Sequence, residues 1–149
     1  MLKIDKEKLP AELNQAVKAE AEHLPFKNDY FELCGIGFGV RNFENLNKCI
    51  KEISRILKKG GKFLTIEMFK PLKPNAANRS FRLYFEKVLP KLGNTLSKSD
   101  YAYNYLFESV DNFLTVKEYS NVLEQNGLGI LKSKNNFLGI VNTVFAEKL

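Results

Sequence analysis

The chain has few residues that bind metal ions and no long apolar run. It has no tryptophan, one histidine and two cysteines among 149 residues, and Cys34 and Cys49 do not have metal-ligand spacing, which argues against a zinc site. So few cysteines are typical of a reduced, intracellular protein. The longest apolar run, residues 33–40, contains three glycines and is far shorter than the ~20 residues of a membrane-spanning helix. Charged residues at 5–8 interrupt any secretory signal, so we expect a cytoplasmic protein.

What the chain does contain is typical of one globular domain. Its length matches a prior of about 150 residues per domain. A content of 44% hydrophobic and 27% charged residues argues against disorder. The net charge of +6 comes mostly from lysines spread along the chain, with one local excess of six basic residues against one acid between Lys70 and Lys91. Because no aromatic–glycine RNA-binding signature and no arginine-rich recognition helix is present, we expect no nucleic-acid partner.

Helical and strand patterns alternate along the chain, which is typical of an α/β fold. Apolar residues at helical spacing predict a helix over residues 45–59, ended by the glycines at 60–61. Thr115 and Glu118 have the spacing of a capping box and predict a helix that ends at Gly127. The other expected elements are a helix tail over 2–9, strands over 15–19, 30–36 and 62–68, two helices within 75–110 that break near 90–93, and a C-terminal hairpin of strands 130–135 and 139–147.

The glycine-rich sequence GIGFG at residues 35–39 follows a predicted strand and precedes a helix. One interpretation is a nucleotide-binding loop, with Glu67 at the end of the next strand binding a ribose, so that a βαβ half-site would hold a dinucleotide or S-adenosylmethionine. The spacing lacks the third glycine of the dinucleotide fingerprint. The alternative is a glycine-rich strand end packed against its neighbours.

Five blocks of sequence, taken together, resemble one known family. They are AEHLPF at 21–26, FELCGIGFGVRNF at 31–43, ISRILKKGGKFLTIEMFKP at 53–71, VLPKLG at 88–93 and YAYNYLFESVDNF at 101–113. Their order and spacing resemble the ubiquinone/menaquinone biosynthesis C-methyltransferase family along the whole chain. The resemblance implies a class I, Rossmann-like fold. It also implies transfer of a methyl group from S-adenosylmethionine to a ring carbon of demethylmenaquinol or of a demethylated ubiquinol precursor.

The same resemblance implies that residues 1–149 form a partial methyltransferase domain, matching the C-terminal two-thirds of the family's domain. The class I sheet has the strand order 3-2-1-4-5-7-6, and residues 1–10 match the helix that follows strand 2. We therefore expect strands 1 and 2 and the glycine-rich cofactor loop to be lacking, and residues 35–39 to end strand 4, which weakens the half-site interpretation. Strand 4 would then expose an unpaired edge. A substrate-cover insertion is expected at about residues 72–113.

The resemblance also places three residues near the cofactor. Glu20 and Ala21 occupy the loop after strand 3, which in the family contacts the adenine end, and the Glu20 carboxylate could accept a hydrogen bond there. The alternative for Glu20 is an exposed loop acid. Gly37, at the end of strand 4, would keep space open beside the cofactor.

Arg41 and Asn42 are the expected catalytic residues. Methylation of a ring carbon requires a quinol hydroxyl to lose its proton as the methyl group transfers. Arginine is too basic to take that proton, so Arg41 would hold a water that does so or stabilise the phenolate, with Asn42 as an orienting donor. The alternative is that Arg41 only caps the strand end. Glu67 could orient Arg41 or line the cleft, and Tyr103 and Tyr105 could contact the quinol ring or pack within the cover.

Several partners and functions stay open at this point. The basic residues of 70–91 lie in the part of the family that covers the substrate entrance, so they could contact anionic lipid head groups as a peripheral membrane site. The alternative is a solvated amphipathic helix. Protein partners would be a second copy of the chain or an N-terminal fragment that supplies strands 1 and 2. The functional alternatives are an inactive fragment, half of a split methyltransferase, or a methyltransferase for another small molecule.

Overall fold

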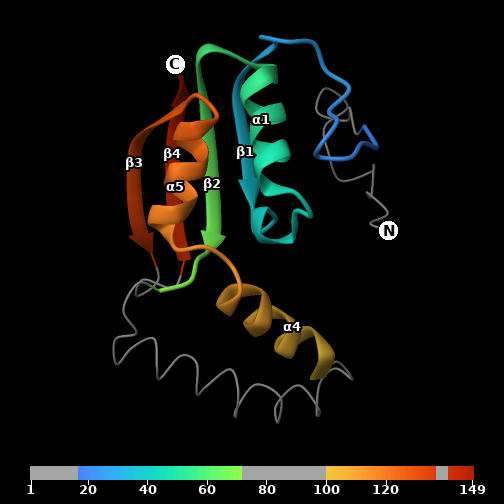
Figure 1. Cartoon of the computed structure of the whole chain (residues 1–149), viewed down its shortest axis with the longest axis vertical. Coiled ribbons are helices and arrows are strands. Elements are labelled where there is room, and N and C mark those ends of the chain that lie inside the picture. The colour runs from blue at the N-terminus through green and yellow to red at the C-terminus, as the bar shows by residue number, and fades with distance from the viewer. Residues whose placement is uncertain (1–16, 72–99, 137–140) are drawn as a thin grey trace, which may run out of the picture.

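The computed structural model describes residues 17–71, 100–136 and 141–149 (Figure 1). In chain order, its elements are β1 (Phe31–Gly37), the 3-10 helix η3 (Val40–Asn42), α1 (Leu46–Ile56), β2 (Leu57–Met68), α4 (Asp100–Asp111), α5 (Val116–Gln125), β3 (Leu128–Asn136) and β4 (Val141–Lys148). The expected α/β character is confirmed. The predicted helix tail at 2–9, the predicted helical break near 90–93 and most of the basic stretch at 70–91 lie outside the described residues.

The four strands form one sheet in the order β1-β2-β4-β3. β2 is parallel to β1, and β4 is antiparallel to both β2 and β3. In the numbering of the expected class I sheet this is the order 4-5-7-6. Within the described residues β1 is therefore an edge strand, on the side where strand 1 of that sheet would pair.

Helices α1 and α5 cover the same face of the sheet (Figure 1). The strands alternate between this covered face and the opposite one, so every second residue of β2 from Phe63 to Glu67 is buried. The apolar core between the helices and the sheet consists mainly of Ile50, Ile53, Leu57, Phe63, Tyr119, Leu123, Leu128, Val144 and Ala146. This packing holds β1 and β2 rigidly side by side, which places their carboxyl ends together.

Two predicted elements differ from the structure. Residues 17–19, the described part of the strand predicted over 15–19, have no regular structure and are followed only by an isolated bridge between Glu20 and His23. A strand needs a neighbour for its backbone hydrogen bonds, and the described sheet offers this segment none. The helix predicted over 45–59 ends at Ile56, because Leu57 is fully buried in extended conformation and starts β2. Gly60 does adopt a positive φ of 75°, but within β2 instead of at a helix end.

The locally encoded elements are confirmed. The Thr115 side chain accepts a hydrogen bond from the Glu118 backbone, and the Glu118 side chain accepts one from the Thr115 backbone, as in a capping box. Gly127, just beyond α5, has a φ of 77°. The C-terminal hairpin is present as β3 and β4, and β1 lies within one residue of its predicted bounds.

Helix α4 lies apart from the two helices that cover the sheet. Figure 1 shows it beyond the arrowheads of β1 and β2, that is, past their carboxyl ends. Its contacts with the rest of the described protein include η3. None of the helices in residues 17–71, 100–136 and 141–149 is long and apolar enough to cross a membrane.

Candidate active site at the carboxyl ends of β1 and β2

The turn after β1 places Arg41 and Asn42 at the carboxyl edge of the sheet. The Phe38 N–H donates to the Ile66 carbonyl at 2.8 Å, which extends the pairing of β1 with β2 by one residue. A positive φ of 55° at Phe38 then turns the chain out of the strand. Val40, the first residue of η3, is buried in the core and so fixes η3 to the sheet. The next two side chains are therefore held above the ends of two parallel strands.

Arg41 forms a buried ion pair with Glu67, near the end of β2. Its Nη1 donates to Glu67 Oε1, and the exposed fractions of the two side chains are 9% and 0%. The same carboxylate oxygen accepts the Met68 backbone N–H at 2.8 Å. Oε2 of Glu67 is also buried, and no hydrogen-bond donor reaches it in the part of the chain that the structure describes. Separating this pair would leave a charge in a low-dielectric site, so the two groups hold each other in place.

Helix α4 contacts both Arg41 and its neighbour Asn42. Arg41 Nε donates to Ser109 Oγ at 3.2 Å, and the Ser109 hydroxyl donates in turn to the Leu106 carbonyl at 2.8 Å. The Tyr105 hydroxyl donates to Asn42 Oδ1 at 3.0 Å. Because Tyr105 and Ser109 are four residues apart, they lie on the same face of α4.

A neutral tyrosine stands close to the Glu67 carboxylate. Burial raises the pKa of Tyr119, and the negative charge of Glu67 raises it further, while the hydrogen bond with Thr65 opposes both effects. The Thr65 and Tyr119 hydroxyls are 2.8 Å apart. Asn142 of β4 is buried and pairs in register with Glu67. The side chains that neighbour Glu67 on this face of the sheet are therefore polar but uncharged.

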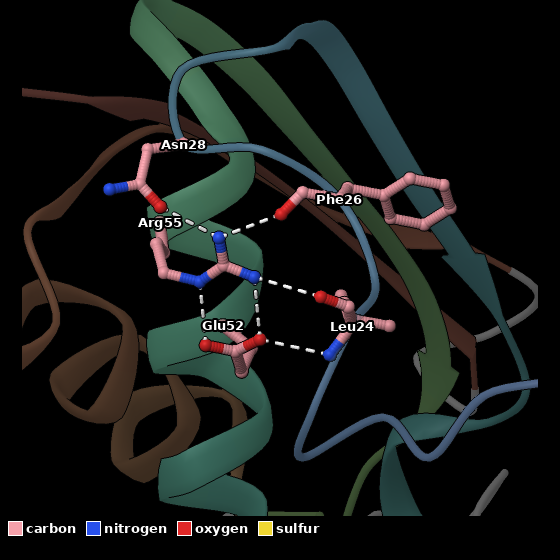
Figure 2. Close-up of polar contacts among 5 residues, drawn as sticks. All are labelled: Leu24, Phe26, Asn28, Glu52 and Arg55. Carbon is pink, nitrogen blue, oxygen red and sulfur yellow. Dashed lines mark hydrogen bonds and ion pairs between the residues drawn. The ribbon is translucent and has the colours of Figure 1, made fainter.

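A second polar network fixes the loop that precedes β1 (Figure 2). Nε and Nη2 of Arg55 donate to the two oxygens of Glu52 at 2.7 and 2.8 Å, so the two side chains form a bidentate pair. Arg55 also donates to the carbonyls of Leu24 and Phe26 and to Oδ1 of Asn28. Glu52 accepts the Leu24 N–H at 2.9 Å. The hydrogen bonds from Arg55 lower the pKa of Glu52 to about 2 against the opposing effect of burial. The network ties the loop to α1.

The cysteines and the histidine carry no site of their own. Burial raises the pKa of both Cys34 and Cys49, so each remains a thiol at neutral pH. Cys49 is buried and Cys34 is partly buried. His23 is exposed in the loop. Within the described residues no group of three or more potential ligands could hold a metal ion.

Comparison with known proteins identifies the relatives of this chain. The profile of the ubiE/COQ5 methyltransferase family matches residues 1–148. The chain belongs to this family. It is 36% identical over 125 residues to the ubiquinone/menaquinone biosynthesis C-methyltransferase UbiE of Bartonella quintana, an alignment that covers 84% of the chain and 48% of that protein. The UbiE protein of Campylobacter jejuni, strain NCTC 11168, is 34% identical over 151 residues, covering 100% of the chain and 63% of that protein. The chain thus spans about half the length of the first curated relatives it matches.

Solved structures support the class I fold. A methyltransferase from Thermotoga maritima, described as a SAM-dependent enzyme and possible histamine N-methyltransferase, matches with a TM-score of 0.59 at 16% identity. The match covers 89% of this chain and 63% of that chain. At this identity the likeness concerns the fold alone. It confirms a partial class I sheet, as the order 4-5-7-6 indicates.

The structure brings together some of the predicted site residues of this methyltransferase-family chain and separates others. Arg41, Asn42, Glu67 and Tyr105 lie in one cluster, joined by the contacts above. Gly37 ends β1 four residues before Arg41, at the same sheet edge.

Glu20 and Ala21 lie elsewhere. Glu20 is exposed and Ala21 half-buried in the loop beside α1, and no hydrogen bond or ion pair among the described residues links either one to the Arg41 cluster. Tyr103 lies on α4.

Sequence reasoning missed Ser109. It is separated from Arg41 by 68 positions, and a serine within a helix carries no local mark of such a contact. Its helical spacing from Tyr105 is the one signal that could have pointed to it, because Tyr105 was itself a candidate and residues four apart share a helix face.

Proposed function

We propose that this chain carries the reaction side of an S-adenosylmethionine-dependent C-methyltransferase, which methylates demethylmenaquinol or a demethylated ubiquinol precursor in quinone biosynthesis. The observation that carries the proposal is the Arg41–Glu67 pair beside Asn42, at the carboxyl ends of two parallel strands. In open α/β sheets this edge is where ligands bind. The names of the family relatives supply the substrate class.

The chemistry demands stabilisation of negative charge on oxygen. S-adenosylmethionine, when bound, offers a methyl group on a positively charged sulfur. On transfer of that methyl group to the ring carbon, the sulfur would leave as a neutral thioether, the quinol hydroxyl would give its proton to a water held by Arg41, and the ring hydrogen at the methylated carbon would then leave as a proton to water. Arg41 stays charged and so serves as a fixed positive group beside the oxygen, not as the base.

Arg41 has N–H groups that no described residue accepts from. Its contacts within the described residues use Nε and Nη1, and Nη2 has no acceptor there. Glu67 neutralises the net charge of the pair and fixes the plane of the guanidinium. An oxyanion held by Nη2 would be stabilised by a preorganised donor, which costs no reorganisation at the moment of reaction.

Gly37 fits a place beside the cofactor. A Cβ atom built on Gly37 would meet no atom within 4 Å, so the space next to the end of β1 is open in the described structure. Glu20 and Ala21 remain proposed contacts for the adenine end, and Tyr103 and Tyr105 proposed contacts for the ring. Glu20 has the exposure that a group awaiting a ligand would need, but so does any loop acid.

The proposal requires more strands than the described sheet contains. Exposed apolar side chains, Tyr30 and Leu33, lie next to and in the edge strand β1. Strand 1 of a class I sheet would pair along this edge, with strand 2 beyond it, and would bring the cofactor loop. We propose that a complementing segment fills this position, with a homodimer as the alternative. A peripheral membrane contact through residues 70–91 is a further proposal, for which the exposed Lys70 is the one basic residue that the structure describes.

Calorimetric titration with S-adenosylmethionine tests the proposed function. The 149-residue chain is compared with a chimera in which the strand 1 and strand 2 segment of the Campylobacter relative is joined to its N-terminus. We expect only the chimera to bind, and to methylate a short-chain demethylmenaquinol. Equal binding by the short chain would favour the GIGFG and Glu67 half-site instead. Binding by neither protein, or methylation only of oxygen or nitrogen acceptors, would contradict the proposal.

A further inference from the structure

Helix α4 contacts two adjacent residues of η3 through one face. Ser109 accepts from Arg41 and Tyr105 donates to Asn42, at 3.2 and 3.0 Å. The partners are separated by 68 and 63 positions in the chain, so only the tertiary fold creates both contacts. Two side chains four residues apart on one helix thus meet two consecutive residues on another element.

The direction of these hydrogen bonds decides which atoms of Arg41 and Asn42 remain available. Ser109 occupies Nε of Arg41 and Glu67 occupies Nη1, so the Nη2 amino group is left over in the described structure. Tyr105 donates to Oδ1, the one acceptor atom of the Asn42 side chain, and the Nδ2 amide group has no acceptor among the described residues. Both neighbouring side chains therefore have N–H groups that lack an acceptor among the described residues.

The burial of Glu67 also favours a ligand that accepts hydrogen bonds. Glu67 is wholly buried beneath Arg41, whose own side chain is 9% exposed. Of the two side chains, only that of Arg41 has any exposed surface in the described structure. The arrangement suits an oxygen that carries negative charge and accepts hydrogen bonds, and disfavours a hydroxyl that must donate one.

We propose that Ser109 and Tyr105 are positioning residues, which orient Arg41 and Asn42 so that their free N–H groups together bind a phenolate oxygen. The inference rests on the proposed function for the identity of the natural ligand, but the phenolate site itself can be tested without methyl transfer. Ser109 holds the guanidinium at Nε, and its own hydroxyl is fixed by the Leu106 carbonyl. Tyr105 prevents the Asn42 amide from turning its oxygen toward the ligand.

A chromogenic phenol measures the effect directly. We would titrate 4-nitrophenol bound to the full chain with pH and read its ionisation by absorbance. A site of N–H donors lowers the pKa of the bound phenol, by about one unit for the wild-type chain. Ser109→Ala and Tyr105→Phe should each remove at least half of this shift. Ser109→Thr, which keeps the hydroxyl, should restore it.

Ser120→Ala is the matched control. It removes a serine hydroxyl from a helix that lies elsewhere, α5, and should leave the pKa of the bound phenol unchanged. Thermal unfolding of every variant checks the fold. If Ser109→Ala does not fold, Tyr105→Phe and Ser109→Thr decide the question.

The outcomes separate the inference from the proposed function. A wild-type chain that does not lower the pKa of bound nitrophenol overturns the inference, as does a Ser109→Ala chain that behaves like Ser120→Ala. A wild-type chain that lowers this pKa while the chimera transfers no methyl group leaves the inference standing and contradicts the proposed function. In an active chimera, Ser109→Ala should lower kcat about 10-fold and change KM by less than about twofold, because misplacement of a catalytic group affects the transition state most.

Discussion

Glu67 binds Arg41 through one carboxylate oxygen, while its other oxygen is buried without a hydrogen-bond donor among the described residues. The pair joins the ends of two strands that are far apart in the chain but adjacent in the sheet. Its neighbours on the covered face, Thr65, Tyr119 and Asn142, are polar and uncharged.

Replacing Glu67 with glutamine should destabilise the protein strongly. Glu67→Gln keeps the side-chain size but leaves the Arg41 charge uncompensated in a buried site, which costs about 3 kcal/mol of unfolding free energy. The control is Glu147→Gln, which breaks an ion pair with Lys62 on the same sheet, where both side chains are about one-third exposed. That variant should cost less than about 1 kcal/mol. Urea unfolding measures both losses of unfolding free energy. Equal losses would show that burial of the Arg41–Glu67 pair does not increase its contribution to stability.

The Glu52–Arg55 network should make stability depend on acidic pH. The pKa of Glu52 lies at about 2 in the folded protein and is ordinarily 4.5, so below pH 4.5 the unfolded chain binds a proton that the folded chain does not. The stabilising contribution of Glu52 is therefore complete above pH 4.5 and is lost as the pH falls toward 2. Glu52→Gln should be less stable than the wild type at neutral pH, and this difference should shrink as the pH falls.

Urea unfolding midpoints at neutral pH and at a pH of about 3 would measure this change. Glu32→Gln is the comparison, because its pair with Lys58 is exposed and contributes little. A difference between Glu52→Gln and the wild type that stays constant over this range would contradict the assigned pKa shift of Glu52.

Removing the cap of α5 should lower stability without affecting the site. Thr115→Ala deletes the hydroxyl that accepts the Glu118 N–H and should cost about 1 kcal/mol. Thr115→Ser keeps that hydroxyl and should remain close to the wild type. The melting temperature reports the difference, and the pKa of bound nitrophenol should not move in either variant. A Thr115→Ala chain as stable as Thr115→Ser would mean that the capping box contributes nothing measurable.

A methyl group at Gly37 should interfere with the cofactor but not with the fold. Its Cβ would enter open space, so Gly37→Ala should change unfolding free energy by less than about 0.5 kcal/mol. In the chimera described above, it should weaken binding of S-adenosylmethionine about 10-fold, by occupying space that the cofactor needs. Gly35→Ala is the control, since its Cβ would make only an ordinary contact with the Leu64 carbonyl at 3.8 Å. Unchanged affinity in Gly37→Ala would place the cofactor away from the end of β1.

Features that depend on near neighbours could be predicted from the sequence. The capping box of Thr115 and Glu118 and the positive φ of Gly127 arise from interactions within a few residues. The end of α1 could not, because burial of Leu57 in the core takes the chain out of the helix before the glycines that seemed to stop it.

The candidate site divides in the same way. The sequence by itself, through its resemblance to the methyltransferase family, determined that Arg41 and Asn42 follow a glycine-rich strand end and that an acid ends the next strand. Only the tertiary structure decided that Glu67 neutralises Arg41 and that Ser109 and Tyr105 direct the free donors of η3, because these contacts span 26 to 68 positions. Hydrogen bonds of this kind require the closure of long loops, and only burial of the core between α1, α5 and the sheet makes that closure favourable.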